Sequence, residues 1–114
     1  MTSDQFPRDQ VMVLEEAIEY ADQSIVSKPV VKSPGGNVSL FAFDAGQELS
    51  EHTAPFDAMV QVIDGTAQIR INDNVHSVNK GDSIIMPAGE PHAVKAVERF
   101  KMLLTMIKSQ EPGG

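Results

Sequence analysis

From residue 58 onward the sequence is a series of short stretches in which apolar and polar residues alternate, each ended by residues typical of tight turns. Alternation with a period of two indicates a strand with one buried face. Turn signals about every eight to twelve residues are typical of antiparallel sandwiches and barrels. The strands expected here cover 58–63, 66–71, 75–78, 83–87, 92–97 and 101–107. Asp64-Gly65 and Asn72-Asp73-Asn74 are expected to form hairpin-type turns, because Asp, Asn and Gly tolerate positive φ.

The first half of the chain adds two strands and one helix to this expectation. The strands cover 24–32 and 38–43, joined by a turn at 33–37 and followed by a second turn at 44–47. A short helix is expected over 14–22, where apolar residues recur at helical spacing with glutamates between them. Residues 1–10 are interpreted as an arm or an edge strand. The sequence therefore predicts an all-β fold of about eight strands with one short N-terminal helix.

Composition limits the organisation of the chain and its partners. A chain of 114 residues has room for one domain, 1–114, with an N-terminal arm and helix over 1–30. The net charge of −7 and the absence of a basic run argue against nucleic acid as a partner. No apolar run is long enough to cross a bilayer and the first residues do not resemble a secretory signal, so we expect no membrane association and a cytoplasmic location. With no cysteine, a metal would need nitrogen and oxygen ligands.

Residues 81–92, GDSIIMPAGEPH, contain a turn glycine, an apolar strand, a proline, a glycine and a histidine in close succession. Pro87 is suited to the end of a strand, where no backbone donor is needed. Gly89 permits a sharp turn, which would direct His92 toward the end of the sheet. His92 is therefore a candidate functional residue.

A second stretch, residues 46–65, carries the other histidine that attracts attention. Gly46 and His52 have the spacing G-x5-H, and Gly65 closes the stretch. Residues 66–80 separate it from residues 81–92. Together the two stretches resemble the two conserved motifs of the cupin superfamily. The resemblance implies a double-stranded β-helix, a barrel of the jelly-roll type, over residues 38–107.

The resemblance also implies a divalent metal held by two histidines and a glutamate of the first motif and by the histidine of the second. Here the second histidine position is Ala54 and the glutamate position is Ala58, so only His52 and His92 remain. Two imidazoles alone would hold Fe, Mn, Ni or Zn weakly, because such sites generally use at least three protein ligands. The sequence leaves open whether a further ligand completes a metal site or whether no metal is bound.

Three carboxylates are candidates for a further ligand. Asp57 is next to the missing glutamate, but strand alternation directs it away from the face of Ala58 unless a bulge follows Pro55. Its alternative role is to cap a turn. Glu48 and Glu51 lie in the preceding loop, and the sequence does not choose among the three.

Two functions are consistent with these residues. One is a binding module that holds a small molecule in the barrel, with His52 and His92 as polar anchors and without a need for metal. The other is a metal-dependent enzyme resembling the cupin dioxygenases and isomerases. No catalytic residue can be named from either, and His76 is interpreted as a solvated strand histidine. Four methionines are interpreted as core packing, with the lining of a ligand pocket as the alternative: Met59, Met86, Met102 and Met106.

The resemblance finally implies association. Small cupins commonly form dimers, and a short chain of strands leaves edges that need cover. We expect a homodimer in which residues before about 31 contribute to the interface.

Overall fold

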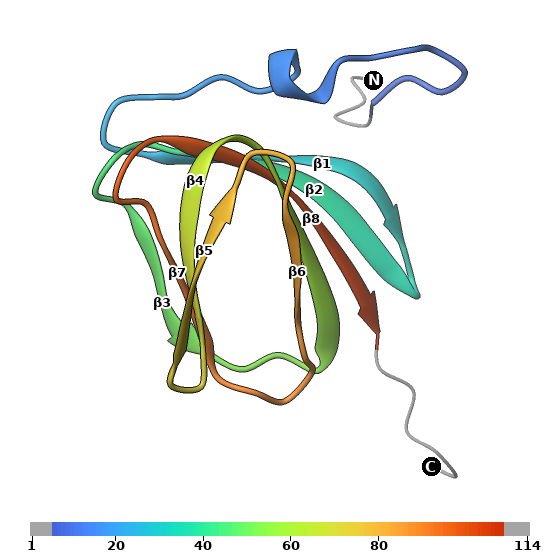
Figure 1. Ribbon diagram of the computed structural model, residues 1–114. Helices are drawn as coiled ribbons and strands as arrows, with labels where there is room; N and C mark the ends of the chain where they lie inside the picture. Colours follow the sequence, from blue (N-terminus) through green and yellow to red (C-terminus); the bar gives the residue numbers. More distant parts are fainter. Residues whose placement is uncertain (1–5, 109–114) are drawn as a thin grey trace, which may run out of the picture.

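The computed structural model describes residues 6–108, and strands make up most of this part of the chain (Figure 1). The strands are β1 (Ile25–Ser33), β2 (Gly36–Phe43), β3 (Glu48–His52), β4 (Phe56–Ile71), β5 (Asn74–Asn79), β6 (Ser83–Met86), β7 (His92–Lys95) and β8 (Phe100–Lys108). Their order is β1-β2-β8-β4-β7-β3, all antiparallel, and β5 and β6 each pair with β4. The sheet curls into a barrel (Figure 1), which confirms the expected all-β fold.

The longest strand, β4, belongs to both halves of the barrel. Its first part, 56–65, pairs with β8 on one side, and 58–61 pair with β6 on the other. Its second part, 66–71, pairs with β5 and with β7. A single strand therefore belongs to both walls of the barrel, the one with β6 and β8 and the one with β5 and β7.

A bulge inside β4 replaces the hairpin that the sequence predicted at Asp64-Gly65. Val62 lies opposite Met102 and Asp64 lies opposite Lys101, so β4 has one residue more than β8 over this stretch. Gly65 has a φ of +72° and lies so close to β8 that a Cβ would collide with the carbonyl oxygen of Arg99. The hairpin prediction is wrong because a left-handed glycine serves a bulge as well as it serves a reversal.

Most other boundaries agree with the sequence analysis. The predicted turns at 33–37 and 44–47 lie between β1, β2 and β3, and Asn72 takes the positive φ of 54° expected in the turn between β4 and β5. The strands expected at 58–63 and 66–71 are one strand, and β3 was not expected. The structure therefore has eight strands, as expected, but they are not the same eight strands that the sequence predicted.

The inner core follows from alternation on either side of the bulge. Val60 and Val62 point into the barrel before it, and Ile69 and Ile71 do so after it; all four are buried. The extra residue in β4 shifts the inward positions from even to odd numbers, so both parts of the strand can contribute. At the opposite end of the barrel from the β6–β7 turn, the rings of Phe43 and Phe100 stack with their centroids 4.5 Å apart.

The helix expected over 14–22 is wrong. Only η1 (Leu14–Glu16), a single 3-10 turn, forms there, and Val13 before it makes no side-chain cap. One turn fixes several dihedral angles for few hydrogen bonds, so a short helix forms only if packing favours it. An extended path instead allows Ile18 to be buried beside β1 and β2 and Tyr20 to reach Asp64, where its hydroxyl donates a hydrogen bond of 2.5 Å. Within 6–108, no helix is long and apolar enough to cross a membrane.

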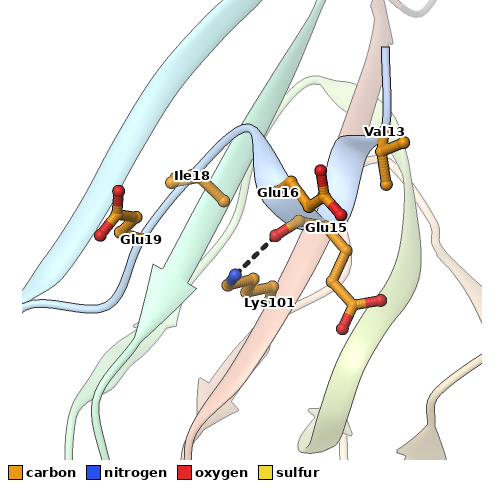
Figure 2. A pocket seen from close by; sticks show the side chains of 6 residues that line it. All are labelled: Val13, Glu15, Glu16, Ile18, Glu19 and Lys101. Atoms are coloured by element: carbon orange, nitrogen blue, oxygen red, sulfur yellow. Dashed lines mark hydrogen bonds between the residues drawn. The ribbon is translucent and has the colours of Figure 1, made fainter.

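This N-terminal segment crosses the outside of the barrel and leaves a cavity of about 390 Å³ beneath it (Figure 2). The lining consists of Val13, Glu15, Glu16, Ile18, Glu19 and Lys101. The ammonium of Lys101 donates a 2.6 Å hydrogen bond to the backbone oxygen of Glu15, which fastens η1 to β8. The cavity is therefore on the outer surface, away from the interior of the barrel.

Candidate functional site

The structure brings the two predicted histidines together. His52 is the last residue of β3 and His92 is the first of β7, and they are direct cross-strand partners. Their rings meet edge to face, with centroids 4.5 Å apart and planes at 69°. His92 is only 4% exposed, whereas His52 is exposed. The pair therefore consists of one buried ring and one ring at the rim of the barrel.

A bulge in β3 gives His52 its direction. Leu49 lies opposite Val94 and His52 lies opposite His92, so three steps along β3 match two along β7. Cross-strand partners project from the same face of a sheet, and Val94 is part of the inner core. Without the extra residue, Glu51 would take the inward position in place of His52.

Both rings make the same contact with the backbone. The Nδ1 atom of His52 lies 2.9 Å from the oxygen of Ser50, and the Nδ1 atom of His92 lies 3.1 Å from the oxygen of Glu90. A carbonyl oxygen can only accept, so Nδ1 carries a proton in both rings, and the neutral tautomer of each ring is the one protonated on Nδ1. In that tautomer the lone pair is on the Nε2 atom.

His92 is held in its neutral form. Burial lowers its pKa below the ordinary value of 6.5, the Glu90 oxygen raises it, and the neighbouring His52 lowers it further. The pKa of His92 falls overall, because removing an imidazolium from water destabilises it more than one carbonyl oxygen stabilises it. At neutral pH the Nε2 atom of His92 is therefore an acceptor and not a donor.

The loop that carries His92 is fastened to its neighbours. Gly89 donates its backbone N–H to the oxygen of Ala54 at 2.9 Å, and Ala88 donates its own to Oδ1 of Asp57 at 2.9 Å. These two bonds join the β6–β7 turn to the connection between β3 and β4, which follows His52, and to the start of β4. The two halves of the site are thus held together by hydrogen bonds between residues that are far apart in the sequence.

The same bonds show what the candidate carboxylates do. Asp57 accepts from the Ala88 amide, which agrees with its turn-capping alternative. Glu51 forms an ion pair with Arg70, with Oε1 and Nη2 2.8 Å apart. Glu48 lines a cavity of about 140 Å³ on the outer surface together with Arg70 and Lys95. None of the three accompanies the histidine pair.

The donor set does not fit a resident first-row divalent ion. Within residues 6–108 no three His, Cys, Asp or Glu side chains are grouped so that they could hold a metal ion. Ala58, at the position where the resemblance implies a glutamate, is buried and has only a methyl group to offer. The histidines alone are fewer ligands than Fe, Mn, Ni or Zn sites generally use.

Two residues of this end of the barrel were not singled out as site residues from the sequence. Met86 and Met106 are the cross-strand partners of Ala58, one on β6 and one on β8. Met86 is 4% exposed within the inner core and Met106 packs against that core. The spacing of methionines along one strand does not reveal that residues from two strands flank the same alanine.

The comparison with known proteins agrees with this architecture. The cupin domain family matches residues 39–108. A conserved protein of unknown function from Streptococcus pyogenes is 35% identical with a TM-score of 0.87, and the alignment covers 93% of each chain. A cupin superfamily protein from Desulfitobacterium hafniense is 27% identical with a TM-score of 0.85, over 90% of this chain and 94% of its own.

A cupin 2 conserved barrel domain protein from Leptotrichia buccalis is 40% identical with a TM-score of 0.80, over 82% of this chain and 46% of its own. This chain thus spans less than half of that protein. No curated protein matches the chain. On the strength of the family match and of these similar structures, the chain belongs to the cupin family.

Proposed function

We propose that this chain binds a small organic molecule at the end of the barrel where His52 and His92 meet, without a resident divalent metal. The observation that supports this most is the buried, neutral His92 with its Nδ1 engaged by Glu90 and its Nε2 left over beside the His52 ring. Within residues 6–108 no fully buried side-chain nitrogen or oxygen lacks a hydrogen-bond partner, so this Nε2 atom is accessible to a ligand that can donate a hydrogen bond to it.

The chemistry of the pair narrows the ligand. Two Nε2 acceptors match a molecule that brings O–H or N–H donors, and the buried side chains Ile71, Val94 and Ala58 match an apolar body. A carboxylate or phosphate would require imidazolium donors, which the lowered pKa of His92 disfavours. The charge of −7 also disfavours anions. The ligand is therefore a neutral or cationic hydroxyl or amine compound.

The test is a ligand-observed NMR screen of neutral alcohols, sugars, amines and carboxylic acids with full-length protein and excess chelator. Binding of hydroxyl or amine compounds that is lost in His92→Ala supports the proposal. His76→Ala is the matched control, because His76 is exposed on β5. Selective binding of carboxylates, or binding that needs added metal, contradicts it.

The alternative is a metal-dependent enzyme of the dioxygenase or isomerase kind. The observation in its favour is the convergence of two rings with unprotonated Nε2 atoms, the form in which imidazole binds metal. Elemental analysis of protein purified without chelator distinguishes the two. Stoichiometric metal that is lost in the double variant His52→Ala, His92→Ala would favour the enzyme.

We also propose that the chain forms a homodimer through residues before about 31. In support, β1 is an edge strand of the sheet, and Val11, Met12 and Val13 are apolar and exposed. Unpaired edges and exposed apolar side chains favour association. Light scattering on the full chain and on a chain that lacks residues 1–30, checked for folding by circular dichroism, tests this; a folded truncated chain that remains a tight dimer would contradict it.

A further inference from the structure

The wall of the barrel formed by β3, β7, β4 and β5 (Figure 1) carries a small cavity on its outer face. The cavity has a volume of about 140 Å³, and all four strands contribute to its lining: Glu48, Gln68, Arg70, Val75, Ala93 and Lys95. Along β4 and β7 these residues alternate with Ile69, Ile71 and Val94, which are buried in the inner core. The cavity is therefore on the opposite face of the wall from the histidine pair. At roughly 30 Å³ per water molecule, it has room for a ligand of only a few non-hydrogen atoms.

Two exposed side chains of opposite charge line this cavity. Glu48 and Lys95 are direct cross-strand partners, and Gln68 is the partner of Lys95 on the other side. Opposite charges at such positions often stabilise a sheet by pairing. Among the ion pairs that residues 6–108 form, however, there is none between Glu48 and Lys95. The cavity thus offers one acidic and one basic group to a ligand.

The remaining lining is either apolar or already compensated in charge. The guanidinium of Arg70 lies 2.8 Å from the carboxylate of Glu51 and donates a 2.8 Å hydrogen bond to the backbone oxygen of Asn72. These two contacts fix Arg70 as a side wall of the cavity. Its cross-strand partners are Ala93 on β7 and Val75 on β5, which add short apolar side chains. The lining therefore matches a molecule with two opposite charges and a short apolar group.

We propose that this outer cavity binds a small zwitterion, a free α-amino acid with a short side chain. Its carboxylate would pair with the ammonium of Lys95 and its ammonium with the carboxylate of Glu48. The side-chain amide of Gln68 can donate to the former or accept from the latter. A zwitterion has no net charge, so the charge of −7 on the chain does not oppose its binding.

A singly charged ligand matches this cavity less well. An anion beside Lys95 would be repelled by Glu48, and a cation beside Glu48 would be repelled by Lys95. A zwitterion is attracted at both ends. Because exposed ion pairs contribute little individually, we expect a Kd in about the millimolar range.

The experiment is an NMR titration of full-length protein with L-alanine at neutral pH, observed through the methyl signals of Ala93 and Val75. We expect saturable shifts of both signals, while the methyl signals of Ile69 and Val94 inside the barrel stay in place. Acetate and methylammonium are titrated separately, and each should bind at least about threefold more weakly than L-alanine, because each lacks one of the two ion pairs.

Charge-removing variants test the two contacts. Lys95→Met and Glu48→Gln should each weaken L-alanine binding by about two- to fivefold. Lys80→Met is the matched control, because Lys80 is an exposed lysine in the turn between β5 and β6. His52→Ala should also leave L-alanine binding unchanged, since the proposal does not rest on the ligand proposed for the interior of the barrel.

Four results would overturn the proposal. They are an absence of shifts with L-alanine, binding of acetate or methylammonium as tight as that of L-alanine, unchanged binding in Lys95→Met or Glu48→Gln, and an equal loss of binding in Lys80→Met or His52→Ala. Circular dichroism of each variant confirms that the protein is folded. Failure of the screen for a ligand of His52 and His92 would leave this cavity as it is, because the two sites lie on opposite faces of the wall.

Discussion

Substitution of Gly65 by alanine tests the bulge on which the path of β4 depends. An alanine with a φ of +72° costs about 1–2 kcal/mol relative to glycine because its Cβ approaches its own backbone. In addition, the new methyl group would collide with the carbonyl oxygen of Arg99 and lie 3.0 Å from the Cα of Phe100, so β8 would have to move. Forced displacement of packed atoms costs about 1–3 kcal/mol, and we therefore expect a total loss of about 3 kcal/mol.

Two other glycines separate the contributions to this loss. Gly46 has a φ of +89° and open space around the position of a Cβ, so Gly46→Ala should show only the conformational cost of about 1–2 kcal/mol. Gly36 needs no positive φ, but a Cβ there would collide with the carbonyl oxygen of Met106, so Gly36→Ala should show only the steric cost. The assay is urea unfolding followed by far-UV circular dichroism, with the free energy of unfolding obtained by linear extrapolation.

The outcome distinguishes a bulge from a hairpin. If Gly65 lay at the tip of a hairpin, nothing would stand near its Cβ and Gly65→Ala would cost no more than Gly46→Ala. Equal losses for these two variants would refute the continuous strand and, with it, the shift of inward positions along β4. A loss for Gly65→Ala close to the sum of the other two would support it.

Three further predictions concern charge and pH. The pKa of His92 is lower in the folded chain than its ordinary 6.5, so the unfolded chain takes up the proton first as the pH falls. The contribution of the neutral ring to stability is therefore complete above about pH 6.5 and declines below it. The free energies of unfolding of the parent and of His92→Gln, measured from about pH 7.5 to about pH 5, should converge toward acid, and a constant difference would contradict this. The guanidinium of Arg99 and the amide of Gln23 lower the pKa of Asp44 from 3.8 to about 2. The contribution of the Asp44 carboxylate to stability is therefore present above about pH 4 and is lost as the pH falls toward 2. In urea unfolding, Asp44→Asn should be less stable than the parent at neutral pH and equal to it at the acid limit. Arg70→Met should leave the histidine pair and ligand affinity unchanged, because the Arg70–Glu51 pair lies on the outer surface and exposed pairs contribute about 0–1 kcal/mol; a large loss of binding in the NMR screen would show that Glu51 belongs to the site.

Alternation and turn residues predicted the fold class because they report the two faces of a strand directly. The strands around Val60, Ile69 and Leu104 were found in this way, and their inward residues are buried. Alternation failed at Gly65 and in β3, since a bulge adds a residue without any change of composition. The helix over 14–22 failed for another reason. Its apolar spacing is real, but contacts of Ile18 and Tyr20 with the barrel override a weak local preference.

The histidine pair was predicted only through the resemblance to the cupin motifs. Spacing along the chain does not place His52 inward, because the bulge at residues 49–52 decides its face. The role of Asp57 was open from the sequence because it depends on the Ala88 amide, which belongs to a distant loop. The sequence offered Met86 and Met106 as core or pocket-lining residues but did not place them on either side of Ala58, because they meet only across strands.

The most direct test of the account is a long-range ¹H–¹⁵N correlation spectrum of the imidazole side chains at neutral pH, combined with cross-relaxation between their ring protons. We predict that His92 carries its proton on Nδ1, that its Nε2 atom is unprotonated, and that the rings of His52 and His92 show mutual contacts. A proton on Nε2 of His92, or an absence of contacts between the rings, would contradict it.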